Sequence, residues 1–320
     1  MTLQLLVENI SNPALLFFML GIVAVLVKSD LSIPDSSSKF ISLYLLFAIG
    51  FKGGQELSHE IINSEVILSI LFGVVLSIVI PVYCFFLLRK KLSVFDSGAV
   101  ASAYGSVSAV TFVTAVTYLE AHQLTLHGHM VAVMALMESP SIIMGILLIS
   151  LYAKEQNHVL NKRDVIHHSL TNGSVFIILG SLIIGFLADS QQAEGIKPFT
   201  NDLFKGFLAI FLLDMGLICG KKLKSFFSYG WYPFLFASII PLLNGSVTAL
   251  LSSFITSDPS NRFMLSVLAA SASYIAVPSA MKLSVPQADP GLYLPMALAV
   301  TFPVNITIGM PVYYAMVNYF

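Results

Sequence analysis

Ten long apolar segments dominate this sequence, and they decide what the chain can fold into. Each is rich in Leu, Ile, Val, Phe, Ala and Gly, and polar turns separate them. They cover residues 13–28, 36–53, 64–88, 96–119, 128–153, 171–188, 202–220, 226–254, 262–283 and 290–318. A helix needs about 20 apolar residues to cross the roughly 30 Å of hydrocarbon in a bilayer. We therefore predict an all-α polytopic membrane protein with ten transmembrane helices.

The small number of charged residues excludes several classes of protein. Lys, Arg, Asp and Glu make up 10% of the 320 residues, whereas soluble domains carry roughly 25%. A soluble enzyme is therefore excluded. The net charge of −1 provides no basic field for nucleic acid. The two cysteines, Cys84 and Cys219, both lie in apolar surroundings and indicate neither a disulfide framework nor a metal cluster.

The loop charges predict the orientation. If the N-terminus lies outside, four of the 16 basic residues face outward, namely Lys52, Lys197, Lys205 and Arg262, and the other twelve fall on the cytoplasmic side. This agrees with the positive-inside rule, and an even number of spans places both termini outside. The hydrophilic stretch 154–170 contains three histidines. We interpret it as a solvated cytoplasmic linker rather than as a metal site.

The linker separates two halves, 1–153 and 171–320, that resemble each other. Gly21 matches Gly180, Gly50 matches Gly216, Gly54 matches Gly220, and Pro140 matches Pro303, at nearly constant separation. Five spans are an odd number, so the second half must cross in the opposite sense. We predict two inverted five-helix repeats, as in many secondary transporters. The alternative is that such matches arise by chance, because glycine is common in membrane helices.

Segments 4 and 9 have the composition of paired interrupted helices. Gly105 lowers the cost of unwinding segment 4, and Pro278 lacks an N–H and clashes with the preceding turn in segment 9. Two half-helix N-termini that face each other would present free N–H groups and positive dipole ends to an anion. Hydroxyls and carbonyls at the same breaks would suit Na⁺. Close helix packing through small residues is the alternative interpretation.

Two acidic residues, Glu138 and Asp214, lie within predicted spans. A charge at the bilayer centre costs about 2.5–3.5 kcal/mol on insertion scales, so it usually has a partner or a function. Glu138 precedes the repeated Pro140 and could hold a cation beside the break in segment 4, or carry a proton. For Asp214, a helix–helix contact and a functional role are equally favoured.

At these residues the chain resembles a known family, the sodium-dependent bicarbonate transporters of the cyanobacterial type. The resemblance rests on GSVSAVT at 105–111, MESP at 137–140, AASASYIAVPS at 269–279 and, most specifically, VPQADPGLY at 285–293. It implies Na⁺-coupled symport of a small anion, with bicarbonate as first choice, by an elevator-like movement. It also implies a homotrimer in the inner membrane of a bacterium, and a small nucleotide-sensing cytoplasmic regulator as partner.

The resemblance also implies which residues bind the solutes. The anion would be held by residues of both breaks, namely Gly105, Ser106, Val107, Ser108, Ser271, Ser273 and Tyr274. Glu138 stands at the family's sodium-site aspartate. We expect the hydroxyls of Ser108, Thr111 and Ser273 to complete the Na⁺ site. Tyr274 stands where the family has an aspartate associated with sodium.

Three other functions are alternatives to symport. A proton- or sodium-coupled exchanger of similar broken-helix build is the nearest alternative, with Glu138 or Asp214 titrating. A channel should have a repeated filter or a charged ring, and the sequence contains neither. An intramembrane enzyme is disfavoured because HExxH and GxSxG motifs are absent and the histidines cluster in loops.

Overall fold

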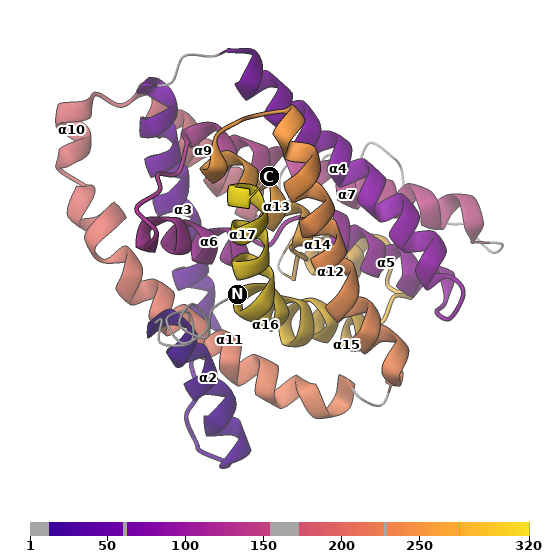
Figure 1. Ribbon diagram of the computed structural model, residues 1–320. Coiled ribbons are helices and arrows are strands. Elements are labelled where there is room, and N and C mark those ends of the chain that lie inside the picture. The colour runs from indigo at the N-terminus through magenta and orange to yellow at the C-terminus, as the bar shows by residue number, and fades with distance from the viewer. Residues whose placement is uncertain (1–12, 60–62, 154–172, 227–228, 275, 320) are drawn as a thin grey trace.

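The computed structural model describes residues 13–59, 63–153, 173–226, 229–274 and 276–319, so the predicted linker 154–170 lies outside the described residues. All regular secondary structure in these ranges is helical (Figure 1). The first half contains α2 (Pro13–Leu26), α3 (Asp35–His59), α4 (Ser64–Leu88), α5 (Val94–Gly105), α6 (Ala109–Ala121) and α7 (Gly128–Tyr152). The second half contains α9 (Gly173–Leu187), α10 (Ser190–Glu194), η1 (Pro198–Asp202), α11 (Phe204–Phe226), α12 (Trp231–Leu251), η3 (Ser252–Phe254), α13 (Pro259–Ala270), α14 (Ala276–Ser284), α15 (Pro290–Pro295), η4 (Met296–Thr301), α16 (Phe302–Val304), η5 (Asn305–Gly309) and α17 (Met310–Tyr319).

Each of the ten predicted segments coincides with one of these helices or with a consecutive run of them. Six stretches are long and apolar enough to cross a membrane by length and composition, namely Ser64–Leu88, Val94–Ala121, Gly128–Tyr152, Pro198–Lys221, Trp231–Phe254 and Pro290–Tyr319. Leu16–Leu26 and Phe176–Leu187 are apolar but shorter. The chain is thus a multi-pass membrane protein with at least part of the predicted set of spans.

Short polar residues begin several of these helices. The Asn63 side chain accepts a hydrogen bond from the Val66 N–H at the start of α4, and Ser93 accepts one from the Asp96 N–H at the start of α5. Asp258 caps α13 in the same way, with Pro259 as the first helical residue. These caps satisfy N–H groups that have no partner within the helix, so the helix starts are encoded locally.

The last predicted segment, 290–318, is the most irregular one. It consists of short α-helical pieces joined by two π-helical stretches, η4 and η5. Pro295, Pro303 and Pro311 recur along it, and each removes one backbone donor from the helical ladder. Wide turns of this kind insert a residue into a helix and are frequent at functional sites.

The helices form two groups by their contacts. In the first, which we call the four-helix group, α2 packs along α11, α3 packs along α9, and α3 touches α11. In the second, the site group, α4, α5 and α7 pack on one another, as do α12, α13 and α17. In this group α6 packs on α13, and α14 packs on α5 and α7. The two groups touch where α3 and α9 pack on α7. Figure 1 shows α2, α3 and α11 at the left and bottom, and α4, α5 and α12 at the right.

Glycines bring the helices of the four-helix group into backbone contact. A Cβ on Gly54 of α3 would lie 2.1 Å from the Leu182 carbonyl oxygen of α9, and a Cβ on Gly216 of α11 would lie 2.1 Å from the Phe18 carbonyl oxygen of α2. Gly50 and Gly54, like Gly216 and Gly220, are four residues apart. This is the small-residue spacing by which membrane helices pack closely.

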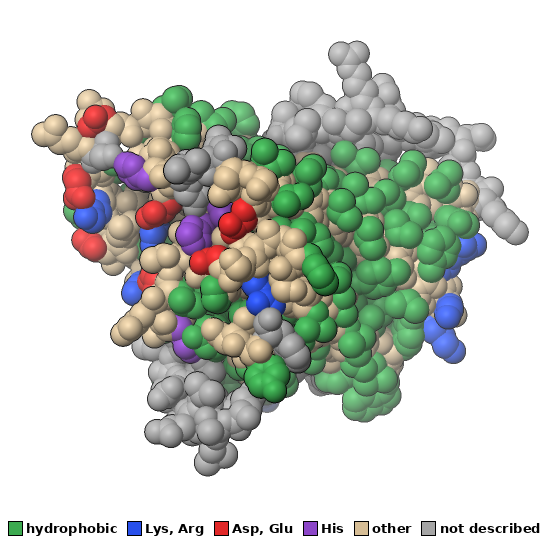
Figure 2. Space-filling view, turned by 45° about the horizontal axis from the view of Figure 1, so that its top comes forward, with side chains coloured by type: hydrophobic (Ala, Val, Ile, Leu, Met, Phe, Trp, Pro, Cys, Tyr) green, Lys and Arg blue, Asp and Glu red, His purple; other side chains and the backbone are tan. Residues whose placement is uncertain are grey.

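The site group exposes two apolar stripes. Side chains four residues apart on α4 and on α12 are each about half exposed, namely Ile67, Leu71, Val75 and Val79, and Leu235, Ile239, Leu243 and Val247. Figure 2 shows a broad green face, with charged side chains gathered at its upper left and lower right edges. Such a surface suits hydrocarbon rather than water.

Candidate functional site

Two helices of the site group are interrupted at their centres. The α5 helix ends at Gly105 and α6 begins at Ala109, while α13 ends at Ala270 and α14 begins at Ala276. Pro278 is the third residue of α14, where its missing N–H would have had no helical partner in any case. Pro278 therefore starts the second half-helix rather than interrupting a continuous one.

Hydrogen bonds join the two breaks directly. The Ser108 N–H donates to the Ser271 hydroxyl at 3.0 Å, and the Ser273 N–H donates to the Ala103 carbonyl at 2.8 Å. The Ser108 hydroxyl accepts from the Thr111 N–H at 3.1 Å and so caps α6. Unwound backbone is tolerated inside a bilayer only where protein or a cavity satisfies it, and here each break partly satisfies the other.

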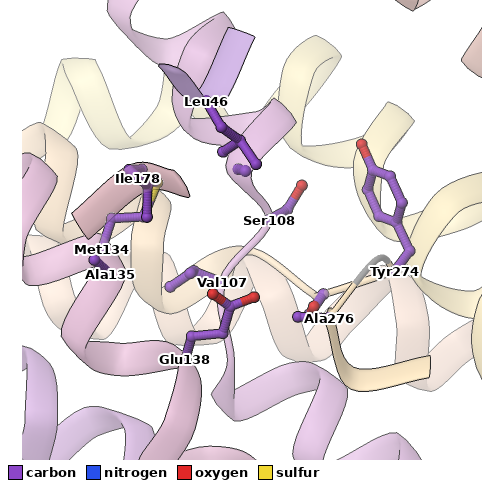
Figure 3. Close-up of a pocket in the computed structure, with 11 residues that line it drawn as sticks. Leu46, Val107, Ser108, Met134, Ala135, Glu138, Ile178, Tyr274 and Ala276 are labelled. Atoms are coloured by element: carbon purple, nitrogen blue, oxygen red, sulfur yellow. The ribbon is translucent and has the colours of Figure 1, made fainter. Parts of the chain in front are cut away.

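A small cavity lies at this junction (Figure 3). Its lining combines the breaks with α7 and with two helices of the four-helix group: Leu46, Val107, Ser108, Ala109, Met134, Ala135, Glu138, Ile178, Ser273, Tyr274 and Ala276. Its volume is about 20 Å³, which is room for about one water-sized sphere. In Figure 3, Glu138 points toward the segment that carries Val107, and the Tyr274 hydroxyl lies beyond Ser108 as seen from Glu138.

Five of the residues named from the sequence line this cavity: Val107, Ser108, Glu138, Ser273 and Tyr274. The others lie close by but in other surroundings. Thr111 is buried in α6, Ser106 is buried in the first break directly after α5, and Ser271 bridges to Ser108. A Cβ on Gly105 would lie 2.1 Å from the Pro81 ring and 2.5 Å from the Ser141 hydroxyl. Gly105 therefore packs against α4 and α7.

Helix ends and one carboxylate set the electrostatics of the cavity. Ala109 and Ala276 are the first residues of α6 and α14, so two positive helix ends point at it. Glu138 is 8% exposed, and no hydrogen bond or ion pair joins its carboxylate to another described residue. The site can therefore offer backbone N–H groups to an anion and a carboxylate with two serine hydroxyls to a cation or proton.

Sequence reasoning missed the apolar side of the cavity. Leu46 of α3 and Ile178 of α9 come from the four-helix group, and Met134 comes from α7. These residues look like any lipid-facing or core residue in the sequence. Only the packing of α3 and α9 against α7 identifies them as part of the wall.

A second, larger cavity of about 420 Å³ lies further along α3 and α6. It is lined by Val116, seven residues beyond Ala109 on α6 and so about 10 Å along that helix. Glu120 of α6 forms ion pairs there with Lys52 of α3 at 3.0 Å and with Lys205 of α11 at 3.1 Å. One carboxylate of the site group is thus shared by two lysines of the four-helix group.

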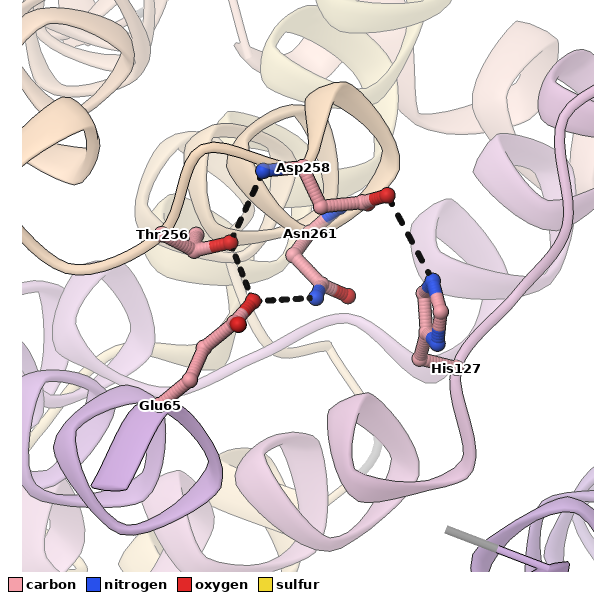
Figure 4. A network of polar contacts seen from close by, with 5 residues as sticks. All are labelled: Glu65, His127, Thr256, Asp258 and Asn261. Carbon is pink, nitrogen blue, oxygen red and sulfur yellow. Dashed lines mark hydrogen bonds and ion pairs between the residues drawn. The ribbon is translucent and has the colours of Figure 1, made fainter. Parts of the chain in front are cut away.

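A polar network joins the starts of α4, α7 and α13 (Figure 4). Glu65 accepts hydrogen bonds from the Thr256 hydroxyl and from Asn261, the latter at 3.1 Å. The His127 Nε2 atom lies 3.6 Å from a carboxylate oxygen of Asp258. Burial alone would raise the pKa of Asp258, but His127 and the Asn261 N–H outweigh burial and hold this pKa below its usual range. The network ties both halves of the chain together at one end of the site group.

The other intramembrane acid, Asp214, lies away from the cavity. It is buried in α11, within the four-helix group, and interacts with Asp35 and Ser38 at the start of α3. Its surroundings are those of a contact between α3 and α11, next to Lys221 of the same helix.

Comparison with known proteins places the whole described fold in one family. A family model described as the Na⁺-dependent bicarbonate transporter superfamily matches residues 13–318. A search among curated proteins finds no match.

Proposed function

Because the chain belongs to the Na⁺-dependent bicarbonate transporter superfamily, a family of transporters rather than of enzymes, we propose that it imports bicarbonate by Na⁺-coupled symport. The observation that carries this proposal is the cavity at which two interrupted helices meet a buried carboxylate. Both solutes have a chemically suitable place there, within one cavity.

The anion is assigned to the helix starts. The N–H groups of Val107, Ala109 and Ala276 belong to the two breaks, near two positive dipole ends. The Val277 N–H already donates to the Ser273 hydroxyl at 3.4 Å. The Ser108 N–H is already bonded to Ser271, so Ser271 shapes the anion site rather than contacting the anion. Ser273 and Tyr274 bound the site from the second break.

The cation is assigned to Glu138 with the hydroxyls of Ser108 and Ser273, which line the same cavity. Thr111 contributes through its N–H, which holds the Ser108 hydroxyl in place. Na⁺ bound beside the carboxylate would cancel the repulsion between Glu138 and a bicarbonate anion. This mutual dependence is a physical basis for coupling, since neither ion binds well alone.

The size of the cavity supports an alternating-access mechanism. A cavity of about 20 Å³ is too small for the four heavy atoms of bicarbonate, so its walls must separate during transport. Leu46 and Ile178 belong to the four-helix group, whereas every other lining residue belongs to the site group. We propose that the site group slides past the four-helix group as an elevator, which would open and close this apolar wall.

The contact pattern supports the inverted repeat. If segments 1–5 correspond to segments 6–10, the pair α3 with α9 becomes the pair α11 with α2, and both pairs are extensive in the structure. The Gly50–Gly54 pair and the Gly216–Gly220 pair occupy corresponding places in these contacts. The contacts of Gly50 with Ser181 and of Gly216 with Gly21 align Gly21 with Ser181, one residue beyond the Gly180 of the sequence comparison.

Three further features are proposed from the family and the loop charges. Both termini would face outward, with residues 154–170 in the cytoplasm between the repeats 1–153 and 171–320. The protein would act as a homotrimer in a bacterial inner membrane. A small nucleotide-sensing protein would be its cytoplasmic regulator.

Proton coupling is the second candidate, because Glu138 has no basic partner among the described residues. Proteoliposomes separate the two. Labelled bicarbonate uptake should require an inward Na⁺ gradient at equal pH, and Glu138→Gln should abolish this requirement together with concentrative uptake. Glu56→Gln changes an exposed glutamate of α3 and serves as the matched control. Uptake that follows a pH gradient in choline medium would refute Na⁺ symport.

A further inference from the structure

A buried amide in the last segment is connected to the cavity without lining it. Asn305 is 1% exposed and begins the π-helical turn η5. Its Nδ2 atom donates to the Ala270 carbonyl at 2.7 Å, and its Oδ1 atom lies 3.1 Å from the Tyr313 hydroxyl. Burying an amide in an apolar span is costly unless its hydrogen bonds are made, so these contacts fix the side chain in one orientation.

The contacts continue from Asn305 to the cavity. Ala270 is the last residue of α13, so its carbonyl has no partner within the helix. The next residue, Ser271, donates its hydroxyl to the Leu268 carbonyl at 2.9 Å and accepts from the Ser108 N–H at 3.0 Å. Ser108 lines the cavity. Two hydrogen bonds, joined by the peptide bond between Ala270 and Ser271, therefore link the π-helical turn to the cavity wall.

The first half of the chain contains the same device. The Ser141 hydroxyl of α7 donates to the Ser102 carbonyl near the end of α5 at 2.8 Å. Ser141 and Asn305 are separated by 305 − 141 = 164 residues. Gly145 and Gly309 are also separated by 309 − 145 = 164 residues. A Cβ on Gly145 would collide with the Ser102 side chain, and a Cβ on Gly309 would collide with the Asn305 side chain, so each glycine leaves room for a polar side chain of its own half. In each half, one side chain of the fifth segment holds the end of the first half-helix.

From these contacts we infer that Asn305 is a positioning residue for the solute cavity: it fixes the end of α13, and thereby the Ser271–Ser108 bridge between the two breaks. This inference rests on the proposed function for its transport consequence. The geometric part of the inference is independent of the proposed function, because the Ser271–Ser108 bridge exists whichever solute is carried.

The variants keep the size of the side chain and remove the donor. Asn305→Asp places an oxygen where the Nδ2 atom faced the Ala270 carbonyl, and Asn305→Leu removes both polar atoms. Asn318→Asp is the matched control, because Asn318 also donates to a backbone carbonyl, that of Tyr314 at 2.8 Å, but is exposed at the end of α17.

Two measurements test the inference. Hydrogen exchange of purified protein without solutes should be about tenfold faster at the Ser108 amide in both Asn305 variants, which is the effect of losing one buried hydrogen bond. In proteoliposomes the KM for bicarbonate should rise about fivefold or more, with Vmax per folded molecule changed less than twofold. Asn318→Asp should leave both quantities unchanged.

The outcomes separate the inference from the proposed function. An unchanged exchange rate at Ser108 in both variants overturns the positioning role, whatever is transported. Loss of folded protein in proportion to Vmax, with KM unchanged, also overturns it, because that is the signature of a purely structural residue. If the unaltered protein carries no bicarbonate, the proposed function fails, and the exchange measurement alone decides on Asn305.

Discussion

Replacing Gly105 by alanine tests whether this residue packs helices or contacts the anion. The added Cβ would lie 2.1 and 2.3 Å from two carbons of the Pro81 ring, whereas carbon atoms in contact are separated by about 3.5–4.0 Å. Pro81 lies inside α4, and its ring cannot rotate away. The helices must therefore move apart by more than about 1 Å, and overpacking of this kind costs about 1–3 kcal/mol.

The expected result is a protein that melts earlier. A loss of about 1–3 kcal/mol lowers the melting temperature by about 2–4 °C per kcal/mol in a chain of this order of size. Melting of the detergent-solubilised variant measures this shift. Gly180→Ala is the control, because a Cβ on Gly180 meets nothing within 4 Å. If Gly105→Ala melts like the unaltered protein but takes up no anion, Gly105 belongs to the binding site and the packing argument is wrong.

Three further changes probe other contacts. Gly54→Ala should also lower the melting temperature, more than Gly180→Ala, because the three atoms nearest to its Cβ would be backbone atoms of α9, which cannot give way. Equal melting of the two variants would contradict this. Glu120→Gln removes both ion pairs between the helix groups and should destabilise the folded protein by at most about 1 kcal/mol per pair. The loss of stability should vanish in 1 M salt. A loss that does not depend on salt would point to another cause. Asp258→Asn keeps a good helix cap but removes a carboxyl whose pKa is depressed. Because folding lowers the pKa of Asp258, its ionised carboxylate stabilises the fold at pH values above the ordinary aspartate pKa, and this contribution is lost as the pH falls below about 4. The unaltered protein should therefore melt at a higher temperature than Asp258→Asn at pH 7, and the difference should disappear in acid.

The sequence was most informative where a residue type has a single strong structural preference. The apolar lengths locate the helices, so that the predicted segment 64–88 coincides with α4 (Ser64–Leu88). Ser-rich runs with Gly105 and Pro278 locate the two interruptions to within a few residues. The helix positions and the interruptions both follow from local chemistry. The thickness of the hydrocarbon layer sets the length of the apolar segments, and residues that lack a backbone donor or a side chain set the interruptions.

The rest depended on packing between distant segments. The serine-rich run predicts an anion contact at Gly105, but it does not reveal that a Cβ there would meet the ring of Pro81, 24 residues earlier. Asn305 gave no signal, because one asparagine among prolines and apolar residues does not reveal which carbonyl it reaches. Leu46 and Ile178 become visible as cavity residues only when two groups of helices are brought together.

The size of the central cavity bears on how well a cell keeps its ion gradients across the membrane. A space of about 20 Å³ holds about one water molecule, too few for a continuous file of water across the site. Protons hop along such files and small ions diffuse through them, so a cavity with room for about one water does not by itself provide such a path. If the protein is the symporter proposed above, it is slow compared with a pore, since each cycle would need a displacement of packed helices, but the gradient that drives it would not be dissipated between cycles.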